Sequence, residues 1–318
     1  MNNAQLHRAK ITVFGMGSVG GTLAYALAVR GLVGEMVLIN RTHEKAVANE
    51  RDLNHGMCFL PHAVIRAGNW EDAADSDVVA ICADAHKGPI TNRLDLAGKN
   101  TALIREIIPP LAKAAPRAVY VVVTNPVDVI AYEVIKVGGF APRQVMATGT
   151  LLDTARLRYI IAAHCGINPH DVQGYVLGEH GDSEMIAWST VTVGGTRMDQ
   201  YCIACGGHCG GLDKEEIANR VKTVGYEVYA AKGATNFAVC ESMVRMIQAV
   251  VRDENRVLTV SGMIDDYCGV NDVCLSVPSL VSHSGVKTLL PLQLNEEEVR
   301  AFRHSGDVVR SVIRKMGF

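Results

Sequence analysis

The stretch Lys10-Ile-Thr-Val-Phe-Gly15-Met-Gly17-Ser-Val-Gly20 decides the fold of this chain. An apolar run typical of a β-strand meets three glycines spaced G-x-G-x-x-G, and an amphipathic helical pattern follows at once. In this order of strand, loop and helix, Gly15 permits a tight turn, Gly17 lets a pyrophosphate approach the backbone, and Gly20 lets helix and strand pack closely. The free N–H groups and the dipole at the helix start attract phosphates. The stretch therefore predicts the phosphate-binding start of a dinucleotide-binding domain.

Strand and helix patterns alternate along the first half of the chain. After the first helix we expect strands at 36–39, 64–67, 78–83, 118–124 and 145–148, with helices at 42–56 and from 94 towards Pro109. Such alternation favours a parallel sheet covered by helices on both faces. Six strands complete a doubly wound (Rossmann) sheet, so we place the end of a dinucleotide-binding domain, residues 1–149, near Gly149.

Residues 150–318 are then expected to form a second, α+β domain that binds the substrate. Its predicted helices lie at 151–165, 217–228, 235–251 and after Asn295, and its predicted strands at 172–177, 257–260 and 273–277. Asp213 with Glu216, and Asn295 with Glu298, have the spacing of helix capping boxes.

Composition excludes several classes of protein. A net charge of -2 gives no electrostatic case for nucleic acid, and no apolar run has the length of a membrane span. Residues 1–8 are polar, lack a signal-peptide core and are interpreted as a loose tail. The nine cysteines are odd in number, which favours reduced, mostly buried thiols and a cytoplasmic location.

The segment Cys202-Ile-Ala-Cys205-Gly-Gly-His208-Cys209 has the composition of a zinc site. Its ligands crowd into one short stretch, without the distant second pair that structural zinc sites use. We interpret it as a flexible loop, with zinc binding as the alternative, and predict no metal for the protein.

The end of the second strand bears on the choice of cofactor. A dinucleotide fold usually places Asp or Glu there to hold the ribose hydroxyls, whereas this chain has Asn40-Arg41-Thr42. A carboxylate repels a 2′-phosphate, but Asn, Arg and Thr can bind one. Alternatively Arg41 is merely solvated, so NAD and NADP both stay open.

Candidate catalytic residues follow at the ends of elements. Residues 84–93 form a polar stretch containing Gly-Pro, which is typical of a lid loop. Asn125 ends a strand, at the edge where such sheets bind ligands. Asp153 and Arg156 share one face of a helix, although a surface ion pair would have the same spacing. His180 stands between glycines in a polar turn, so we expect an accessible ring rather than a core residue.

With these features together, the chain resembles the L-lactate dehydrogenase family, which includes malate and 2-hydroxyisocaproate dehydrogenases. The motifs that carry the resemblance are the glycine loop, Thr124-Asn-Pro-Val-Asp128, Leu152-Asp-Thr-Ala-Arg156 and Leu177-Gly-Glu-His-Gly-Asp-Ser183. The resemblance implies reversible hydride transfer between a nicotinamide cofactor, NAD or NADP, and a small L-2-hydroxy or 2-keto acid. It also implies a homo-oligomer, either a tetramer or a dimer.

The resemblance further assigns roles to individual residues. His180 would exchange the substrate proton, Asp153 would orient it, and Arg93 would arrive with the closing loop and polarise the carbonyl. Substrate would contact Arg156, which clamps the carboxylate, together with Asn125, Thr235 and Lys87. The residues expected at the cofactor are Gly15, Met16, Gly17, Ser18, Val19, Gly20, Asn40, Arg41, Asn100 and Asn125.

Some positions depart from the family pattern. Lys87 stands where lactate enzymes carry Gln and malate enzymes carry Arg, so activity on a dicarboxylate is the alternative. Arg158 matches an arginine that binds a sugar bisphosphate in activated members, but Gln173 replaces the partner histidine, which argues against that regulation. A hypothesis of another class is a non-catalytic dinucleotide-binding protein. The full set of catalytic residues speaks against it.

Overall fold

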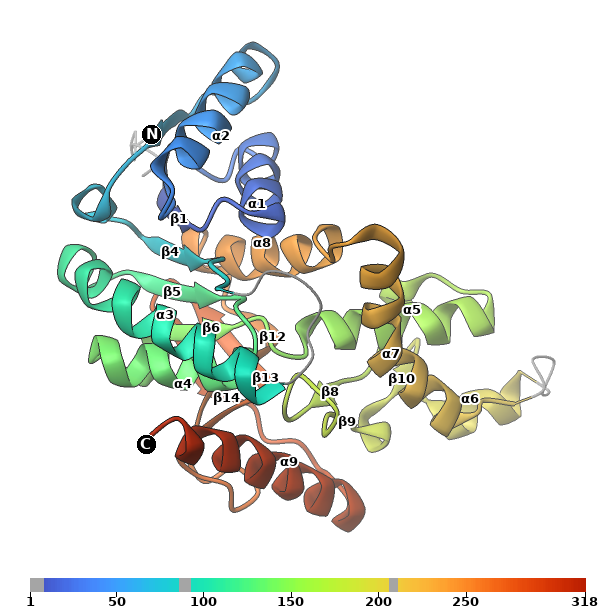
Figure 1. The fold of residues 1–318 in the computed structure, drawn as a ribbon. Helices are drawn as coiled ribbons and strands as arrows, with labels where there is room; N and C mark the ends of the chain where they lie inside the picture. The colour runs from blue at the N-terminus through green and yellow to red at the C-terminus, as the bar shows by residue number, and fades with distance from the viewer. Residues whose placement is uncertain (1–8, 86–92, 206–210) are drawn as a thin grey trace, which may run out of the picture.

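The computed structural model describes residues 9–85, 93–205 and 211–318, apart from the side chains of residues 93–95. Six parallel strands form one side of a nine-stranded sheet and reach its edge at residues 64–67 (Figure 1). They are β1 (Lys10–Phe14), β2 (Glu35–Ile39), β3 (Val64–Ala67), β4 (Val78–Ile81), β5 (Val119–Val122) and β6 (Val145–Ala147). Their spatial order, β3-β2-β1-β4-β5-β6, is that of a doubly wound dinucleotide-binding sheet, which confirms the predicted fold class.

Three antiparallel strands from the second half continue the same sheet. These are β12 (Arg256–Ile264), β13 (Val273–Ser282) and β14 (Gly285–Leu289), and β12 joins β6 where Ser261 lies beside Ala147. The sheet therefore does not end at Gly149. The strands predicted at 257–260 and 273–277 were too short, and β14 was not predicted. The missed residues include small polar side chains such as Ser261 and Ser279, which are buried and interrupt the apolar pattern.

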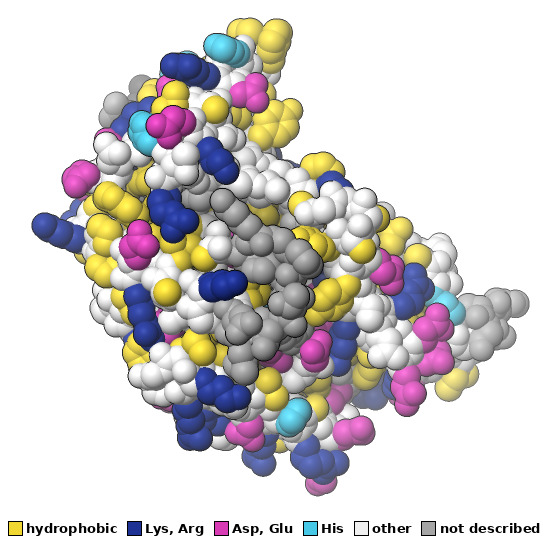
Figure 2. Space-filling view, in the orientation of Figure 1, with side chains coloured by type: hydrophobic (Ala, Val, Ile, Leu, Met, Phe, Trp, Pro, Cys, Tyr) yellow, Lys and Arg dark blue, Asp and Glu magenta, His cyan; other side chains and the backbone are white. Residues whose placement is uncertain are grey.

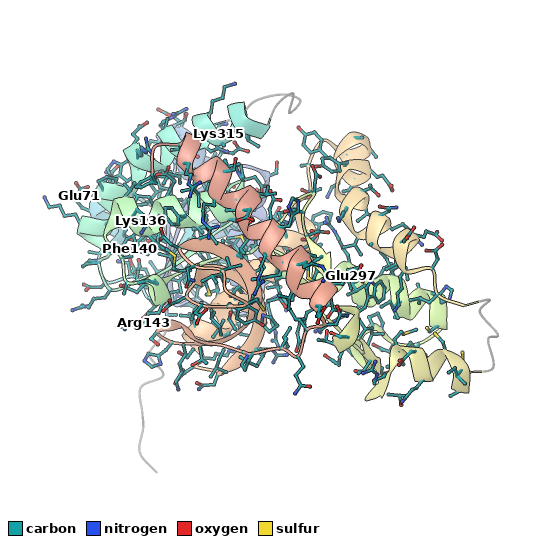
Figure 3. The ribbon with its side chains drawn as sticks, turned by 90° about the horizontal axis from the view of Figure 1, so that it is seen from below. Glu71, Lys136, Phe140, Arg143, Glu297 and Lys315 are labelled. Carbon is teal, nitrogen blue, oxygen red and sulfur yellow. The ribbon has the colours of Figure 1, made fainter. Side chains whose placement is uncertain are left out.

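Helices from both halves cover the two faces of this sheet. One face carries α1 (Ser18–Val29), α2 (His43–His55) and α8 (Phe237–Val251). The other carries α3 (Arg93–Ala114), α4 (Val127–Gly138) and α9 (Glu296–Lys315). Figure 3 shows α9 crossing the underside of the molecule. The buried Leu and Ile side chains of these helices contribute roughly 1.5–3 kcal/mol each, so the second half of the chain helps to stabilise the first.

Helix α3 corrects the prediction that this helix ends near Pro109. It continues through Pro109 and Pro110 to Ala114. Proline inside a helix removes a hydrogen bond and costs about 3 kcal/mol. Ile107, Ile108 and Leu111 are fully buried around the two prolines, and this burial offsets the cost.

A smaller lobe extends beyond the large sheet, at the right of Figure 1. Its helices are α5 (Leu151–Cys165), α6 (Met198–Ala204) and α7 (Lys214–Lys232). Strands β7 (Val172–Gln173), β10 (Thr192–Val193) and β11 (Thr196–Arg197) form one sheet, and β8 (Val176–Leu177) with β9 (Met185–Ile186) forms another. The single strand predicted at 172–177 is therefore wrong. The chain turns between two sheets at Gly174, where a Cβ would lie only 3.0 Å from the Val191 side chain.

Short 3₁₀ helices and caps complete the secondary structure. The 3₁₀ segments are Met57–Phe59, Trp70–Ala73, Pro142–Gln144, Pro169–Asp171 and Trp188–Thr190. Asn295 and Glu298 form the predicted capping box at the start of α9. At the start of α7, the Asp213 side chain accepts hydrogen bonds from the backbone N–H groups of Glu215 and Glu216.

The cysteines depart from the expectation of mostly buried thiols. Of the eight described, only Cys240 and Cys274 are buried, and Cys58 is exposed. Cys202 lies in α6 rather than in a loop, and the Cys205 thiol donates to the Cys202 carbonyl oxygen over 3.3 Å. His208 and Cys209 lie outside the described residues, so the zinc alternative stays untested.

The surface carries interspersed charges. In Figure 2 the Lys and Arg side chains on this face alternate with Asp and Glu, without one large patch of either sign. Within residues 9–85, 93–205 and 211–318, no helix is long and apolar enough to cross a membrane.

Candidate active site

The glycine loop between β1 and α1 has the shape that dinucleotide binding requires. Gly15 has φ +100°, and a Cβ on Gly20 would lie 1.8 Å from the Gly15 carbonyl oxygen. The loop therefore closes tightly under the helix start only without side chains at these positions. A Cβ on Gly17 would meet nothing within 4 Å, so open space lies above its backbone. The first N–H groups of α1 follow directly, and the loop fits a bound pyrophosphate.

Asn40 uses its side chain to hold this loop on the end of β2. Its Oδ1 accepts from the Met16 N–H over 2.9 Å, and its Nδ2 donates to the Thr42 carbonyl oxygen over 2.9 Å. An aspartate could accept from Met16 but could not donate to Thr42. Arg41 is exposed next to this amide. Ser18 is also exposed, whereas Met16 is buried.

Asn100 joins the ends of two central strands. Its fully buried side chain accepts from the Ala85 N–H over 2.8 Å and donates to the Asn125 carbonyl oxygen over 2.7 Å. The Asn125–Pro126 peptide bond is cis. The Asn100 side chain thus supports the backbone of Asn125 at the ligand edge of the sheet.

Asp153 on α5 brings two predicted site residues together. Its Oδ2 lies 2.6 Å from His180 Nδ1, and its Oδ1 accepts from Arg156 Nη1 over 2.7 Å. The Asp153 side chain is 2% exposed, whereas that of His180 is 28% exposed. One buried carboxylate therefore orients both an imidazole and a guanidinium, and leaves part of the imidazole accessible.

The loop that carries His180 is fixed from three elements. Gly178, with φ +92°, exchanges two backbone hydrogen bonds with Ser276 of β13. Ser305 of α9 accepts from the Glu179 N–H over 2.7 Å. Asp128 of α4 accepts from the His180 N–H over 2.8 Å. Three elements separated along the chain thus determine where the imidazole lies.

The electrostatics of the site favour a protonated His180. Burial by itself lowers the pKa of His180, but the charge of Asp153 and the hydrogen bond to it, aided by Glu184 and Asp128, raise that pKa to about 9. Burial opposes ionisation of Asp153, yet His180 and Arg156 together keep its pKa below the usual value. The pair can therefore hold an imidazolium beside a carboxylate near neutral pH.

The structure describes only some of the remaining predicted residues. The Arg156 guanidinium lies against α7, where a Cβ on Gly225 would be 3.2 Å from Nη2. Thr235 is half-buried between α7 and α8. Arg93 is the first residue of α3, but its side chain lies outside the described part, as does all of Lys87. Arg158 lies apart from these residues, 6.0 Å from the ring centre of Tyr175.

Reasoning from sequence missed Asp128 and Glu184 as site residues. Asp128 is 2% exposed in the otherwise apolar start of α4, and that lone carboxylate was the available signal. Glu184 is 6% exposed. One of its carboxylate oxygens, one of Asp153 and a ring nitrogen of His180 all lie within 4.8 Å of one another. Glu184 also lines a hollow of about 410 Å³ between the His180 loop, Lys222 of α7 and His304 of α9.

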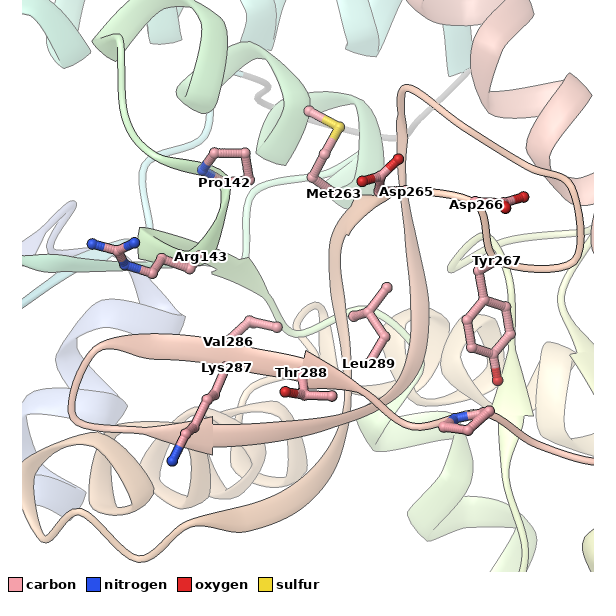
Figure 4. A pocket seen from close by; sticks show the side chains of 11 residues that line it. Pro142, Arg143, Met263, Asp265, Asp266, Tyr267, Val286, Lys287, Thr288 and Leu289 are labelled. Carbon is pink, nitrogen blue, oxygen red and sulfur yellow. The ribbon is translucent and has the colours of Figure 1, made fainter.

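A larger hollow, of about 560 Å³, lies away from this centre (Figure 4). It is lined by Pro142 and Arg143 together with residues of β12, β14 and the loop at Asp265. It contains none of the predicted site residues.

Comparison with known families agrees with this geometry. Residues 9–147 match the model for the lactate/malate dehydrogenase NAD binding domain, and residues 150–317 match the model for the alpha/beta C-terminal domain of the same family. The chain belongs to the lactate/malate dehydrogenase family.

Relatives that align over nearly the whole of both chains are L-lactate dehydrogenases. An L-lactate dehydrogenase of Thermoanaerobacter sp. (strain X514) is 41% identical over 96% of this chain and 99% of the relative. One from Acetivibrio thermocellus is 40% identical over 99% of both chains. The crystal structure of a minor L-lactate dehydrogenase from Enterococcus mundtii superposes with a TM-score of 0.91 at 33% identity, covering 97% of this chain and 98% of that one. This lactate/malate dehydrogenase family member is an L-2-hydroxy acid oxidoreductase that uses a nicotinamide dinucleotide.

Proposed function

We propose that the protein is an L-lactate dehydrogenase that reversibly interconverts an L-2-hydroxy acid, lactate or a longer analogue, and its 2-keto acid. The observation that carries the proposal is the arrangement of His180 and Arg156 around the buried carboxylate of Asp153. The open backbone at Gly17 and the N–H groups at the start of α1 would hold the cofactor pyrophosphate. When bound, the nicotinamide supplies or accepts the hydride.

His180 is the proposed acid–base group. Its Nδ1 is held by Asp153, so its Nε2 is the atom available to give a proton to the substrate oxygen during reduction. Asp153 keeps the ring oriented and stabilises its cation. In the oxidative direction, neutral His180 takes the hydroxyl proton.

Arg156 is the proposed substrate clamp. Its Nη1 donates a hydrogen bond to Asp153. The other N–H groups of the planar guanidinium would bind the substrate carboxylate through two hydrogen bonds. Asn125 and Thr235 would line the same pocket. Arg93, at the start of α3, would polarise the substrate carbonyl in the transition state.

The substrate itself is best tested with a panel of 2-keto acids. We expect pyruvate or a longer monocarboxylate to give the highest kcat/KM with NADH or NADPH. A preference for oxaloacetate would instead assign malate-type activity, the alternative raised by Lys87. No oxidation of either reduced cofactor with any acid would favour a non-catalytic dinucleotide-binding protein.

The choice between NAD and NADP depends on Asn40 and Arg41. We propose that NADPH binds at least comparably to NADH, because no carboxylate stands at the end of β2 to repel a 2′-phosphate. Titration of wild type and Arg41→Ala with both cofactors tests this. An unchanged ratio of the two affinities would show that Arg41 does not contact a 2′-phosphate.

We also propose a cytoplasmic homo-oligomer, either a tetramer or a dimer. In support, α7 and the start of α8 expose large apolar side chains, including Tyr226, Tyr229 and Phe237. Light scattering coupled to size-exclusion chromatography would determine the number of subunits. A monomer at micromolar concentration would contradict the proposal.

A further inference from the structure

Glu184 is a second buried carboxyl group beside the catalytic pair. The Glu184 N–H donates to the Gly181 carbonyl oxygen over 3.2 Å, in a turn that directs residue 184 back towards His180. A carboxylate oxygen of Glu184 lies within 4.8 Å of a ring nitrogen of His180 and of a carboxylate oxygen of Asp153. Apart from these three residues, the described part of the chain holds no other group of His, Cys, Asp and Glu side chains as close together.

Two carboxylates so close to one imidazole cannot ionise independently. Burial and the charge of Asp153 raise the pKa of Glu184 to about 8, whereas His180, Lys222 and Arg156 act in the opposite direction. The charge of Glu184 in turn raises the pKa of His180. The groups facing this pair are Asp153 and Arg156 from α5, Asp128 from α4 and Lys222 from α7, and His304 of α9 lines the adjoining hollow.

The ionisation of each group therefore depends on that of the other. When His180 carries a proton, an anionic Glu184 is favoured, because the two charges attract at short distance. When His180 is neutral, Asp153 repels an anionic Glu184 and favours its protonated form. Coupled groups of this kind titrate in steps that belong to the pair rather than to one residue.

We propose that Glu184 is a positioning residue that sets the pH at which His180 exchanges its proton. Glu184 acts through His180 and does not contact the reacting atoms. The proposal rests on the proposed dehydrogenase function, in which His180 is the acid–base group.

The test compares Glu184→Gln with wild type in both reaction directions. With saturating cofactor, we expect the decline of kcat/KM for keto-acid reduction to move to lower pH by about 1 unit. The rise of kcat/KM for hydroxy-acid oxidation should move by a similar amount in the same direction, because both report loss of the His180 proton. A role confined to folding or packing would change the rates without moving these midpoints.

Glu298→Gln is the matched control. Glu298 is also 6% exposed, but its carboxylate accepts hydrogen bonds from Ser189 and lies in the capping box of α9. We expect its substitution to leave the midpoints unchanged. Glu184→Asp keeps a carboxylate on a shorter side chain, so its midpoints should lie between those of wild type and Glu184→Gln. If Glu184→Gln does not fold, the midpoints of Glu184→Asp test the proposal instead.

Titration of His180 by NMR separates this proposal from the proposed function. The His180 signals are assigned by their absence in His180→Ala, and their midpoint is followed in the folded protein without substrate. A lower midpoint in Glu184→Gln supports the proposal even if no 2-keto acid is turned over. Unchanged midpoints in both the kinetics and the NMR titration would overturn it, whatever the change in kcat.

Discussion

The backbone N–H of His180 donates to Oδ2 of Asp128 over 2.8 Å, which holds the loop that carries His180 against the start of α4. Asp128 lies in the first half of the chain and His180 in the second. Burial raises the pKa of Asp128 to about 6, against the opposing effect of its hydrogen bonds. This contact therefore links the position of the imidazole to a carboxylate that titrates under mildly acidic conditions.

Asp128→Asn should change the pH dependence of stability. Because the folded-state pKa of Asp128 is raised, the folded protein binds this proton more tightly than the unfolded chain does. Its contribution to the free energy of unfolding is full below about pH 4 and is lost as the pH rises to about 6. Asparagine does not ionise, so this loss is absent in Asp128→Asn. Between pH 4 and 7 the free energy of unfolding should therefore become more favourable to the folded state in Asp128→Asn, relative to wild type, by roughly 1–3 kcal/mol. Urea unfolding at both pH values measures it, with exposed Asp265→Asn as the control. Equal pH dependence in Asp128→Asn and wild type would contradict this prediction.

His180→Ala should abolish most turnover and leave cofactor binding intact. A general acid–base group typically contributes about a hundredfold to ten-thousandfold to the rate. The ring lies against Asp153 rather than at the glycine loop, so fluorescence titration with the reduced cofactor should give a nearly unchanged Kd. His164→Ala, on the exposed side of α5, is the control. Near-normal kcat in His180→Ala would remove the acid–base assignment.

Gly17→Ala and Gly20→Ala should have different consequences. A Cβ at residue 17 meets nothing within 4 Å, so the Gly17→Ala variant should fold normally but bind the cofactor pyrophosphate more weakly. A Cβ at residue 20 would lie 1.8 Å from the Gly15 carbonyl oxygen, and the resulting overpacking should cost roughly 1–3 kcal/mol or more. Thermal unfolding without cofactor and binding titrations distinguish the two effects. Equal Tm values for both variants would argue against the loop geometry described above.

Arg156→Lys should lower kcat/KM about tenfold to a hundredfold, mainly through a higher KM for the keto acid. Lysine keeps the positive charge beside Asp153 but cannot offer the planar pair of donors that binds a carboxylate. Steady-state kinetics with saturating cofactor measure the change. Arg158→Lys, on the same helix but beside Tyr175, is the control. If the two variants lose activity equally, a specific role for Arg156 is not supported.

The sequence alone determined the parallel part of the sheet, because strand-forming runs and glycines are local signals. Lys10–Gly20, with its spacing of Gly15, Gly17 and Gly20, predicts strand, tight turn and helix without reference to distant residues. The spacing of Asp153 and Arg156 likewise places both on one helix face, and the structure brings His180 to the same carboxylate. These features depend on neighbours within a few positions, and they were predicted.

Only the tertiary structure decided the rest, because it depends on contacts between distant segments. Strands β12 to β14 and helices α8 and α9 complete the large sheet and its covering layers, and no local pattern shows that a strand will pair with β6. Asp128 reaches His180 from α4, and the turn after His180 brings Glu184 back to the imidazole. The pKa values of both carboxylates rise because the surrounding fold buries them away from water. Sequence shows which residues can ionise, but folding fixes the distances and burial that determine when they do.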